Sequence, residues 1–501
     1  MFEGKNISIF IQDRCMIKNL NFTLNKGDKL AIIGEEGNGK STLLMALLGI
    51  CPYAKMTGTI QTKGNRIGYL KQTIEEEILE KTGYEYVFED DFYRGNAFYK
   101  KMDLLKFKED RLTEKIKNLS GGEKVKIRLL KLLLEENDLL FLDEPTDDLD
   151  IETLEWLETF IQNTNIPILY VSHDETLLSR TANKILHLEQ RKKKTESHYT
   201  LLKIDYDTYV NQRQRALEKQ TQVAKFEKRE FQKKQEKLNQ VMQKVEYQQN
   251  TISRKDPHGA RLLKKKMHAL KSQEKKLENF DGTKVPDVEE GISFAFETVE
   301  IPKNKKILDL KIPELKAQDN VLATNIELEV FGNVHLCIIG PNGIGKTTLM
   351  KEIREALKER KDLHVGYMPQ NYEDLFNEEE PVLHFLVPNS IKEDLTKARA
   401  YLGNMKFTRD EMNGKIKDLS NGSKAKLILT KFVLERCDVL LLDEPTRNVS
   451  PLSNPVIRQA LKEFNGTILS ISHDRKYIDE VIDCLYLLTE EGLVKKNIVK
   501  N

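Results

Sequence analysis

Long hydrophobic runs are absent from this sequence. No stretch approaches the roughly 18 consecutive apolar residues that a membrane-spanning helix needs. The N-terminal residues Met1–Lys5 do not form the basic-then-apolar pattern of a secretory signal. The five cysteines are scattered and include no C-x-x-C pair, so we expect reduced core thiols rather than a disulfide framework or a zinc site. These absences predict a cytosolic protein without a membrane span.

Proline and glycine are almost missing between Lys203 and Phe280, where Pro257 and Gly259 are the only examples. Little in this stretch interrupts a helix. Apolar residues recur there every seven positions, at Val210, Leu217, Ala224, Phe231, Leu238, Val245 and Ile252. A second helical pattern follows, with one apolar face made of Leu263, Met267, Leu270 and Leu277. We expect a helical hairpin that stands out from the body of the protein, with an elbow at Ser253, Arg254, Lys255, Asp256, Pro257, His258 and Gly259.

The same stretch is strongly basic. Residues 203–280 hold 20 Lys or Arg against 10 Asp or Glu, whereas the whole chain has a net charge of only +1. An isolated lysine-rich helix is usually a solvated surface. Here the imbalance is confined to one protruding element, which favours a polyanion as its partner.

The rest of the chain contains an internal repeat. Landmarks recur in the same order at an offset of 300 residues, which pairs Ser120 with Ser420, Asp143 with Asp443 and His173 with His473. Two copies of one domain therefore flank the hairpin, and we predict three parts, residues 1–202, the linker 203–285 and residues 286–501. In each copy, strand-like runs alternate with helical stretches, as in Lys29–Ile33 followed by Ser41–Leu48. This alternation predicts an α/β fold built on a largely parallel sheet.

A glycine-rich G-x-x-x-x-G-K-[ST] loop follows an apolar run in each copy. In such loops the backbone N–H groups and a helix N-terminus face phosphate oxygens, the lysine holds the β- and γ-phosphates, and the last hydroxyl ligates Mg²⁺. Two loops in this context predict two ATP sites. Their nucleotide-binding residues are Gly34, Glu35, Glu36, Gly37, Asn38, Gly39, Lys40, Ser41 and Thr42, and in the second copy Gly340, Pro341, Asn342, Gly343, Ile344, Gly345, Lys346, Thr347 and Thr348.

Two adjacent carboxylates end a later apolar run in each copy. Asp143 and Asp443 are predicted to join Ser41 and Thr347 around Mg²⁺, while Glu144 and Glu444 polarise the attacking water. Each copy then has a histidine after a β-rich run, and we expect His173 and His473 to contact a γ-phosphate and sense its presence.

A further anion-binding helix start precedes the carboxylates in each copy, at Ser120, Gly121, Gly122 and Glu123 and at Ser420, Asn421, Gly422 and Ser423. With the phosphate loops, and with Gln72 and Gln370 between them, this set resembles the nucleotide-binding domain of ATP-binding cassette (ABC) proteins. The resemblance implies an ATPase with two tandem ABC-type P-loop domains joined by the hairpin, and Gln72 and Gln370 as further catalytic and Mg²⁺-binding residues. It also implies two ATP molecules sandwiched head to tail within one monomer. Gly34–Ser41 would then face Ser420–Ser423, and Gly340–Thr347 would face Ser120–Glu123.

The tandem copies and the long charged linker look like the ABC-F branch of this family, whose members bind ribosomes. That resemblance implies a hairpin reaching from the E site along large-subunit ribosomal RNA and P-site tRNA toward the peptidyl-transferase centre. A basic rod suits such a corridor. The string Glu444–Ser453 looks like the bacterial antibiotic-resistance members that act against lincosamides, pleuromutilins and streptogramin A.

The second copy departs from the family pattern. Ser450 stands where the first copy has Asp150, and Asn421 and Ser423 replace a glycine and an acidic or amide residue. These departures all lie in the copy that would cover the first phosphate loop, so we predict two unequal ATP sites.

Three other functions fit parts of the sequence. A housekeeping or stress translation factor would bind the ribosome without a drug role. The ATPase subunit of an exporter would not need the hairpin, and a DNA-repair ATPase would have a much longer coil or zinc cysteines.

Overall fold

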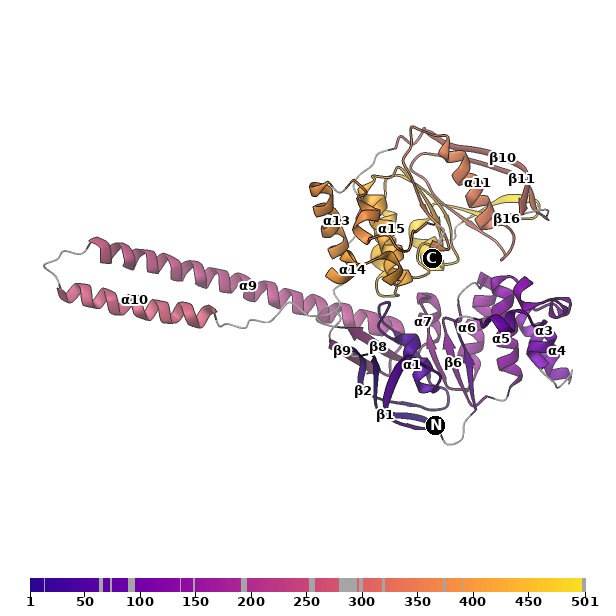
Figure 1. The fold of residues 1–501 in the computed structure, drawn as a ribbon, viewed down its shortest axis with the longest axis horizontal. Helices are drawn as coiled ribbons and strands as arrows, with labels where there is room; N and C mark the ends of the chain where they lie inside the picture. Colours follow the sequence, from indigo (N-terminus) through magenta and orange to yellow (C-terminus); the bar gives the residue numbers. More distant parts are fainter. Residues whose placement is uncertain are drawn as a thin grey trace. The chain divides into compact units, whose positions relative to one another are not determined.

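The computed structural model describes residues 1–12, 14–62, 66–72, 74–88, 95–135, 137–146, 149–190, 196–251, 257–278, 295–296, 301–317, 320–372, 375–389 and 391–497. They form two compact units, one of residues 1–207 with 291–501 and one of residues 208–290. The first unit contains two α/β domains, which we call the first copy (β1 to β9) and the second copy (β10 to β17) (Figure 1).

The first copy alternates strands and helices. Its strands are β1 (Phe2–Ile11), β2 (Arg14–Leu24), β3 (Lys29–Ile33), β4 (Ala54–Gln61), β5 (Ile67–Leu70), β6 (Leu139–Asp143), β7 (Ile168–Val171), β8 (Lys184–Gln190) and β9 (Glu196–Leu202). Its helices are α1 (Lys40–Leu47), α2 (Glu76–Leu79), α3 (Gly83–Phe88), α4 (Asn96–Leu105), α5 (Gly121–Leu134), α6 (Ile151–Asn163) and α7 (Glu175–Thr181), with short 3₁₀ turns η1 (Glu109–Thr113) and η2 (Ile116–Asn118).

The second copy repeats this order. Its strands are β10 (Lys306–Ala317), β11 (Asn320–Phe331), β12 (His335–Ile339), β13 (Val365–Met368), β14 (Val439–Asp443), β15 (Thr467–Ile471), β16 (Cys484–Thr489) and β17 (Gly492–Lys496). Its helices are α11 (Lys346–Lys358), α12 (Val382–Leu386), α13 (Lys392–Asn404), α14 (Arg409–Asn413), α15 (Asn421–Leu434), α16 (Asn454–Lys462) and α17 (Arg475–Val481), with the turn η4 (Ile416–Asp418).

Each copy is built on a six-stranded sheet with the same topology. The strand order is β5-β6-β7-β3-β8-β9 in the first copy and β13-β14-β15-β12-β16-β17 in the second. Every neighbouring pair is parallel except the antiparallel edge pairs β8–β9 and β16–β17. The prediction of an α/β fold with a largely parallel sheet is therefore confirmed.

The central strands are apolar because both faces of the sheet are covered. Every residue of β3, β6 and β7 is buried, as is every residue of β14 and β15. The carboxyl ends of β3 and β6, and of β12 and β14, lie at one edge of each sheet, which is where parallel α/β sheets place their ligands. This edge carries the predicted phosphate loops and carboxylate pairs.

The second unit is a helical hairpin of α9 (Tyr206–Thr251) and α10 (Pro257–Glu278), two helices that lie side by side (Figure 1). Leu238 and Val245 of α9 are buried with Leu270 of α10, and Leu263 and Met267 pack against them. The heptad pattern therefore predicted the correct contact face for this part of the hairpin. Of the elbow, Ser253–Asp256 lies outside the described residues, and Pro257, His258 and Gly259 begin α10.

The sequence predicted no membrane-spanning helix and reduced cysteines, and the structure can be compared with both expectations. Within the described ranges, no helix has the length and apolar character that crossing a membrane requires. All five cysteines are free thiols, of which Cys337 and Cys437 are buried and the other three partly exposed.

Candidate functional site

The two phosphate loops are held tightly against a neighbouring strand. Gly34 has a φ of 148°, and a Cβ on it would lie 2.3 Å from the Leu188 carbonyl oxygen in β8. Gly340 has a φ of 158°, and its Cβ would lie 2.8 Å from the Leu488 carbonyl oxygen in β16. Only glycine fits at these positions, because any side chain would collide with backbone.

The lysine of each loop folds back over its own loop. Lys40 Nζ donates to the carbonyl oxygens of Gly34 at 2.8 Å and Glu35 at 3.2 Å. Lys346 Nζ donates to those of Gly340 at 2.8 Å and Pro341 at 3.0 Å. Each ammonium thus lies over a loop whose backbone can surround a phosphate.

The hydroxyl that ends each loop meets the aspartate that ends the neighbouring strand. Ser41 Oγ donates to Asp143 Oδ1 at 2.9 Å, and Thr347 Oγ1 donates to Asp443 Oδ2 at 3.0 Å. The sheet therefore joins two motifs that lie about one hundred residues apart in the sequence. The sequence analysis predicted that these two motifs share one site. Each pair offers only oxygen donors, the type that Mg²⁺ prefers.

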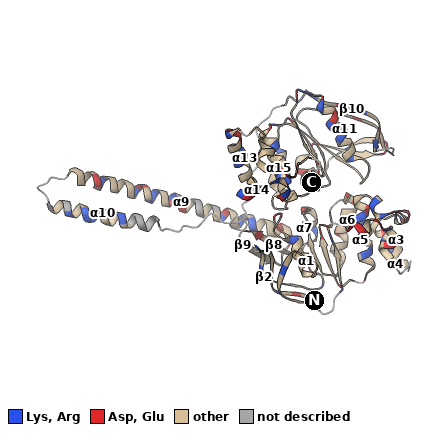
Figure 2. Cartoon of the chain, viewed as in Figure 1, with Lys and Arg blue, Asp and Glu red and all other residues tan. Residues whose placement is uncertain are grey.

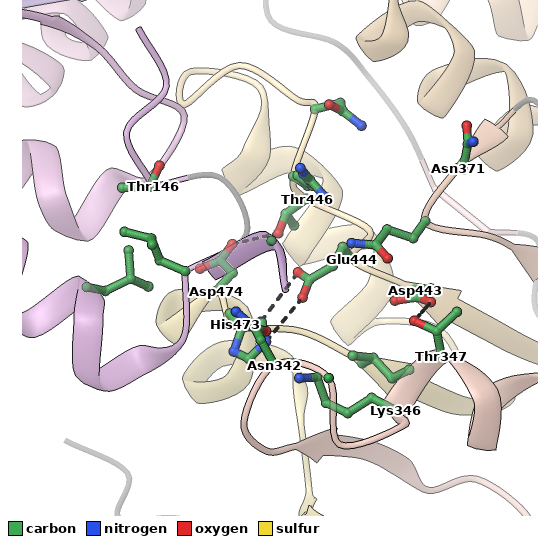
Figure 3. A pocket seen from close by; sticks show the side chains of 18 of the residues that line it. Thr146, Asn342, Lys346, Thr347, Asn371, Asp443, Glu444, Thr446, His473 and Asp474 are labelled. Carbon is green, nitrogen blue, oxygen red and sulfur yellow. Dashed lines mark hydrogen bonds and ion pairs between the residues drawn. The ribbon is translucent and has the colours of Figure 1, made fainter. Parts of the chain in front are cut away.

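A cavity of about 820 Å³ opens at the second loop, large enough for a small-molecule ligand (Figure 3). The second copy lines it with the loop from Asn342 to Thr348 and with Gln370, Asp443, Glu444 and His473. The first copy contributes other walls, among them Gly121, Thr146, His173 and Gln72. The site at Gly340–Thr347 is therefore completed by Gly121, at the helix start that the resemblance placed opposite this loop.

The two glutamates after the aspartates have unusual backbone geometry. Glu144 has a φ of 48° and Glu444 a φ of 55°, in the left-handed region that non-glycine residues adopt uncommonly. Their backbone N–H groups donate to Val171 O at 3.0 Å and Ile471 O at 2.9 Å, which holds this conformation. Burial, reinforced by the neighbouring Asp443, raises the pKa of Glu444 to about 8.

The two histidines contact these glutamates. The backbone N–H of His173 donates to Glu144 Oε2 at 3.0 Å. In the second copy, the backbone N–H of His473 donates to Glu444 Oε2 at 3.4 Å, and Figure 3 shows these two residues side by side. Burial and the nearby Lys40 lower the pKa of His173 to about 3, so its ring is neutral. Its Nδ1 lies 2.9 Å from the Val449 carbonyl oxygen and its Nε2 lies 3.2 Å from Glu144 Oε1, so the ring bridges this glutamate and the second copy.

The helix starts at Ser120 and Ser420 are capped differently. Ser120 Oγ accepts from the backbone N–H of Glu123 at 3.3 Å, and Glu123 Oε2 accepts from that of Ser120 at 2.9 Å, a capping box that begins α5. Although burial opposes it, bonding to Arg111 and Ser120 lowers the pKa of Glu123 to about 2.

In the second copy, Ser423 replaces the acidic partner of this box. Ser420 Oγ still accepts from the backbone N–H of Ser423 at 3.1 Å, but it now donates to the Ser423 hydroxyl at 3.0 Å. The departure seen in the sequence thus removes the reciprocal half of the cap from α15.

The first phosphate loop lies against the second copy through its two acidic side chains. Lys426 Nζ lies 3.1 Å from Glu35 Oε2 and 3.6 Å from Glu36 Oε2. Ser450 and Ser453 donate their hydroxyls to Glu35 Oε1 at 2.6 and 2.7 Å. We call these five residues the Lys426 cluster. Despite burial, Lys426 and the two hydroxyls lower the pKa of Glu35 to about 2, so the carboxylate is ionised.

The Lys426 cluster has no exact counterpart at the matching positions of the other site. Lys126, which corresponds to Lys426, lies 4.0 Å from Asp150 of its own copy. Ser450 replaces that aspartate in the second copy, and the second phosphate loop has Pro341 and Asn342 in place of the two glutamates. Lys126 therefore has its acidic partner in its own copy, whereas Lys426 has its acidic partners in the facing copy.

A set of charged residues at the contact between the copies was missed by the sequence analysis. Glu158 and Glu175 of the first copy contact Arg475 and Arg458 of the second. A comparison of charges at the 300-residue offset would have found them, because each glutamate is matched by an arginine in the other copy.

The hairpin presents a basic surface of its own. Lys and Arg positions are distributed along α10 in Figure 2, and those whose side chains are described as exposed are Arg261, Lys264, Lys265, Lys266 and Lys271. By helix periodicity, Arg261, Lys264 and Lys265 lie on the side of α10 away from the buried Leu270, and Lys266 and Lys271 lie at the edges of its apolar face.

Comparisons with known proteins place the two copies in one family. The family model described as "ABC transporter" matches residues 17–147 and 323–447, which together make up just over half of the chain. The "Ribosome protection protein VmlR" of Bacillus subtilis (strain 168) is 29% identical over 524 residues, which covers 98% of this chain and 87% of that protein. The "ABC transporter F family member 2" of Arabidopsis thaliana is 26% identical and covers 98% of this chain and 76% of that protein.

Solved structures show the same fold. An archaeal ribosome recycling factor, solved with the ribosomal stalk protein aP1, matches with a TM-score of 0.60 at 18% identity, over 96% of this chain and 88% of that one. A structure described as "RNase-L Inhibitor" also has a TM-score of 0.60, at 17% identity, over 97% of this chain and 90% of that one.

Proposed function

This chain belongs to the ATP-binding cassette family and is an ATPase, and from that premise we propose that it binds the ribosome and dislodges antibiotics from the peptidyl-transferase centre. The observation that carries the proposal is the similarity to a ribosome protection protein over 98% of the chain, the hairpin included. The sequence pattern Glu444–Ser453 and the basic α10 support it independently.

We infer that ATP binds in the cavity at Gly340–Thr347, between the second phosphate loop and the helix start at Ser120. Lys346 would leave its carbonyl partners to hold the β- and γ-phosphates, and the N-terminus of α5 would face the γ-phosphate. Because Gly121 lines this cavity from the first copy, the nucleotide would hold the two copies together.

Hydrolysis at this site depends on Glu444. Its position beside Asp443 and the backbone N–H of His473, which donates to Glu444 Oε2, would aim the carboxylate at the attacking water. Thr347 and Asp443 fit Mg²⁺ because their oxygens already lie together. When bound there, the ion neutralises charge on the phosphate oxygens.

The first site is the weaker one for catalysis. Its phosphate loop carries Glu35 and Glu36, whose charges oppose those of a nucleotide unless Lys426 balances them. It also faces the α15 start, which lacks the acidic capping partner. We infer that the first site mainly holds the copies together and that the second site turns over ATP.

The hairpin would carry this action to the ribosome. Closing of the two copies on ATP would fit them into the ribosomal E site and place α10 against RNA phosphates, with the elbow at Ser253–Gly259 directed toward the drug site and P-site tRNA. Hydrolysis would then open the copies and release the protein. Such a protein would act where translation takes place, in the cytoplasm.

The test is translation in a purified system inhibited by a lincosamide or a pleuromutilin. The intact protein should restore synthesis, and a variant with residues 253–256 deleted should not, although it hydrolyses ATP at the same rate. If the intact protein binds ribosomes but leaves drug inhibition unchanged, the chain is instead a translation factor without a drug role. Equal protection by the shortened variant would contradict the proposed task of the elbow.

A further inference from the structure

The contact between the two copies has its charges inverted at matching positions. At the 300-residue offset, Glu158 corresponds to Arg458 and Glu175 to Arg475, and the third pair is Arg180 with Glu480. At the first two positions the first copy is acidic and the second copy is basic, and at the third position the signs are reversed. The inversion is complete at all three positions.

These residues contact one another in two equivalent sets. Across the interface, Arg458 Nη1 and Nη2 donate to the two carboxylate oxygens of Glu175 at 2.5 and 3.3 Å. Arg475 donates to both oxygens of Glu158 in the same way. Glu158 of the first copy therefore meets Arg475 of the second, and Arg458 of the second meets Glu175 of the first. Because 458 matches 158 and 475 matches 175, the two contacts are related as a two-fold axis requires.

The third position supports each set from within its own copy. Arg180 Nη1 lies 2.7 Å from Glu158 Oε2, and Arg458 Nε lies 2.8 Å from Glu480 Oε2. Each interface residue on α6 or α16 is therefore held by a neighbour of opposite charge before it meets the facing copy. This fixes its side chain toward the interface.

Burial makes these charges matter. The side chains of Arg458, Glu158 and Glu175 are only 3, 4 and 6% exposed. Exposed ion pairs contribute little, but a charge at a buried interface is strongly unfavourable when its partner is missing or carries the same sign. In a pair of two first copies, Glu158 would meet Glu175 twice, and in a pair of two second copies the arginines would meet.

We propose that this inverted charge pattern commits each copy to the other, so that ATP sites form only between a first and a second copy. The two copies have the same topology, and without such a pattern surfaces from different chains could pair through two first or two second copies. Because Glu175 and Arg475 follow the site histidines by two residues, the pattern acts at the edge of the ATP sites. The partner it selects is a copy of the same fold with reversed charges.

Charge reversal in the full-length chain tests this directly. In E158R/E175R both copies become basic at the interface, and in R458E/R475E both become acidic. We expect each variant to lose ATP turnover by tenfold or more, with circular dichroism unchanged. An equimolar mixture of the two should regain turnover and sediment as a complex of two chains, since acidic copies can then meet basic ones.

The control exchanges all three pairs in one chain, as E158R/E175R/R180E with R458E/R475E/E480R. This variant restores the contacts among these six residues with reversed sign, although Lys476 and Asp174 keep their charges beside positions 175 and 475. It should therefore sediment as a monomer and hydrolyse ATP well above the rate of either double variant. The proposal is overturned if this variant is no more active than the two double variants, or if the double variants keep full turnover. If the double variants fail to fold, the fully exchanged chain alone tests the proposal. The proposal then requires that this chain folds and hydrolyses ATP, and an inactive chain overturns it.

Discussion

Replacing Lys426 by methionine is predicted to weaken closure of the first ATP site specifically. Lys426, Glu35 and Glu36 have side chains that are 8, 20 and 12% exposed, so the substitution would leave two largely buried carboxylates without their Lys426 partner. At an effective dielectric constant of about 20, unit charges separated by the 3.1 Å between Lys426 and Glu35 attract by roughly 5 kcal/mol. Desolvation offsets part of this, and removal of one partner of a buried pair costs about 3–5 kcal/mol.

The two copies can avoid this cost by separating, which lets water reach the carboxylates. A cost of about 3 kcal/mol therefore corresponds to a shift of about 100-fold from closed to open. The assay is energy transfer between one dye on each copy, followed during an ATP titration. Lys426→Met should raise the ATP concentration for half-closing by about this factor.

The matched control is Lys126→Met in the other copy. Among the residues that the structure describes, the ion-pair partner of Lys126 is the partly exposed Asp150, 4.0 Å away, so the loss of Lys126 should cost at most about 1 kcal/mol, or roughly fivefold. The triple variant Glu35→Gln/Glu36→Gln/Lys426→Met removes both signs together and should recover most of the closure. If the two lysine variants shift closure equally, the Lys426 cluster does not hold the first site.

Two further substitutions follow from the site geometry. Glu444→Gln should lower the ATPase kcat by roughly 100-fold in steady-state assays, because this is the usual contribution of a positioned base. Glu144→Gln should lower the kcat clearly less. The opposite order would contradict the assignment of turnover to the second site. Gly34→Ala should abolish nucleotide binding at the first site or prevent folding, because its Cβ would collide with the Leu188 carbonyl, whereas Gly403→Ala in α13, where a Cβ meets nothing within 4 Å, should leave binding and Tm nearly unchanged.

Much of the fold was predictable because its signals are local. The strand at Lys29–Ile33 and the helix expected over Ser41–Leu48 appear as β3 and α1, within one residue at each end of the helix. The helix starts expected at Ser120–Glu123 and Ser420–Ser423 appear as the first turns of α5 and α15, each under a serine cap. The break near Ser253 and the heptad pattern likewise predicted two helices in the hairpin.

The contacts between the copies were less predictable. The facing of Gly34–Ser41 with Ser420–Ser423 followed from the resemblance, and Glu36 does lie against Gly422 in the structure. What Glu35 and Glu36 do there was not foreseen, because their partner Lys426 lies about 390 residues away and looks like any surface lysine on a helix. Side-chain partners across an interface depend on geometry that no local pattern contains.

The difference between the two ATP sites was predictable in one part and unpredictable in another. The replacement of Asp150 by Ser450 was visible in the sequence and predicted unequal sites. Its physical result is that the acidic partner of the lysine lies in the facing copy instead of its own. The sequence does not predict this contact, because it joins three segments that are distant in the chain. The loss of the capping box at Ser423 could be predicted from the residue change alone.

The most direct test of the account is the sedimentation of the full-length Glu144→Gln/Glu444→Gln variant with ribosomes in the presence of ATP. Without a base at either site, ATP should stay bound, the copies should stay closed, and the variant should remain on ribosomes with its hairpin crosslinking to large-subunit RNA. A variant that stays at the top of the gradient with ATP present would contradict the claim that nucleotide-held copies present the basic hairpin to ribosomal RNA.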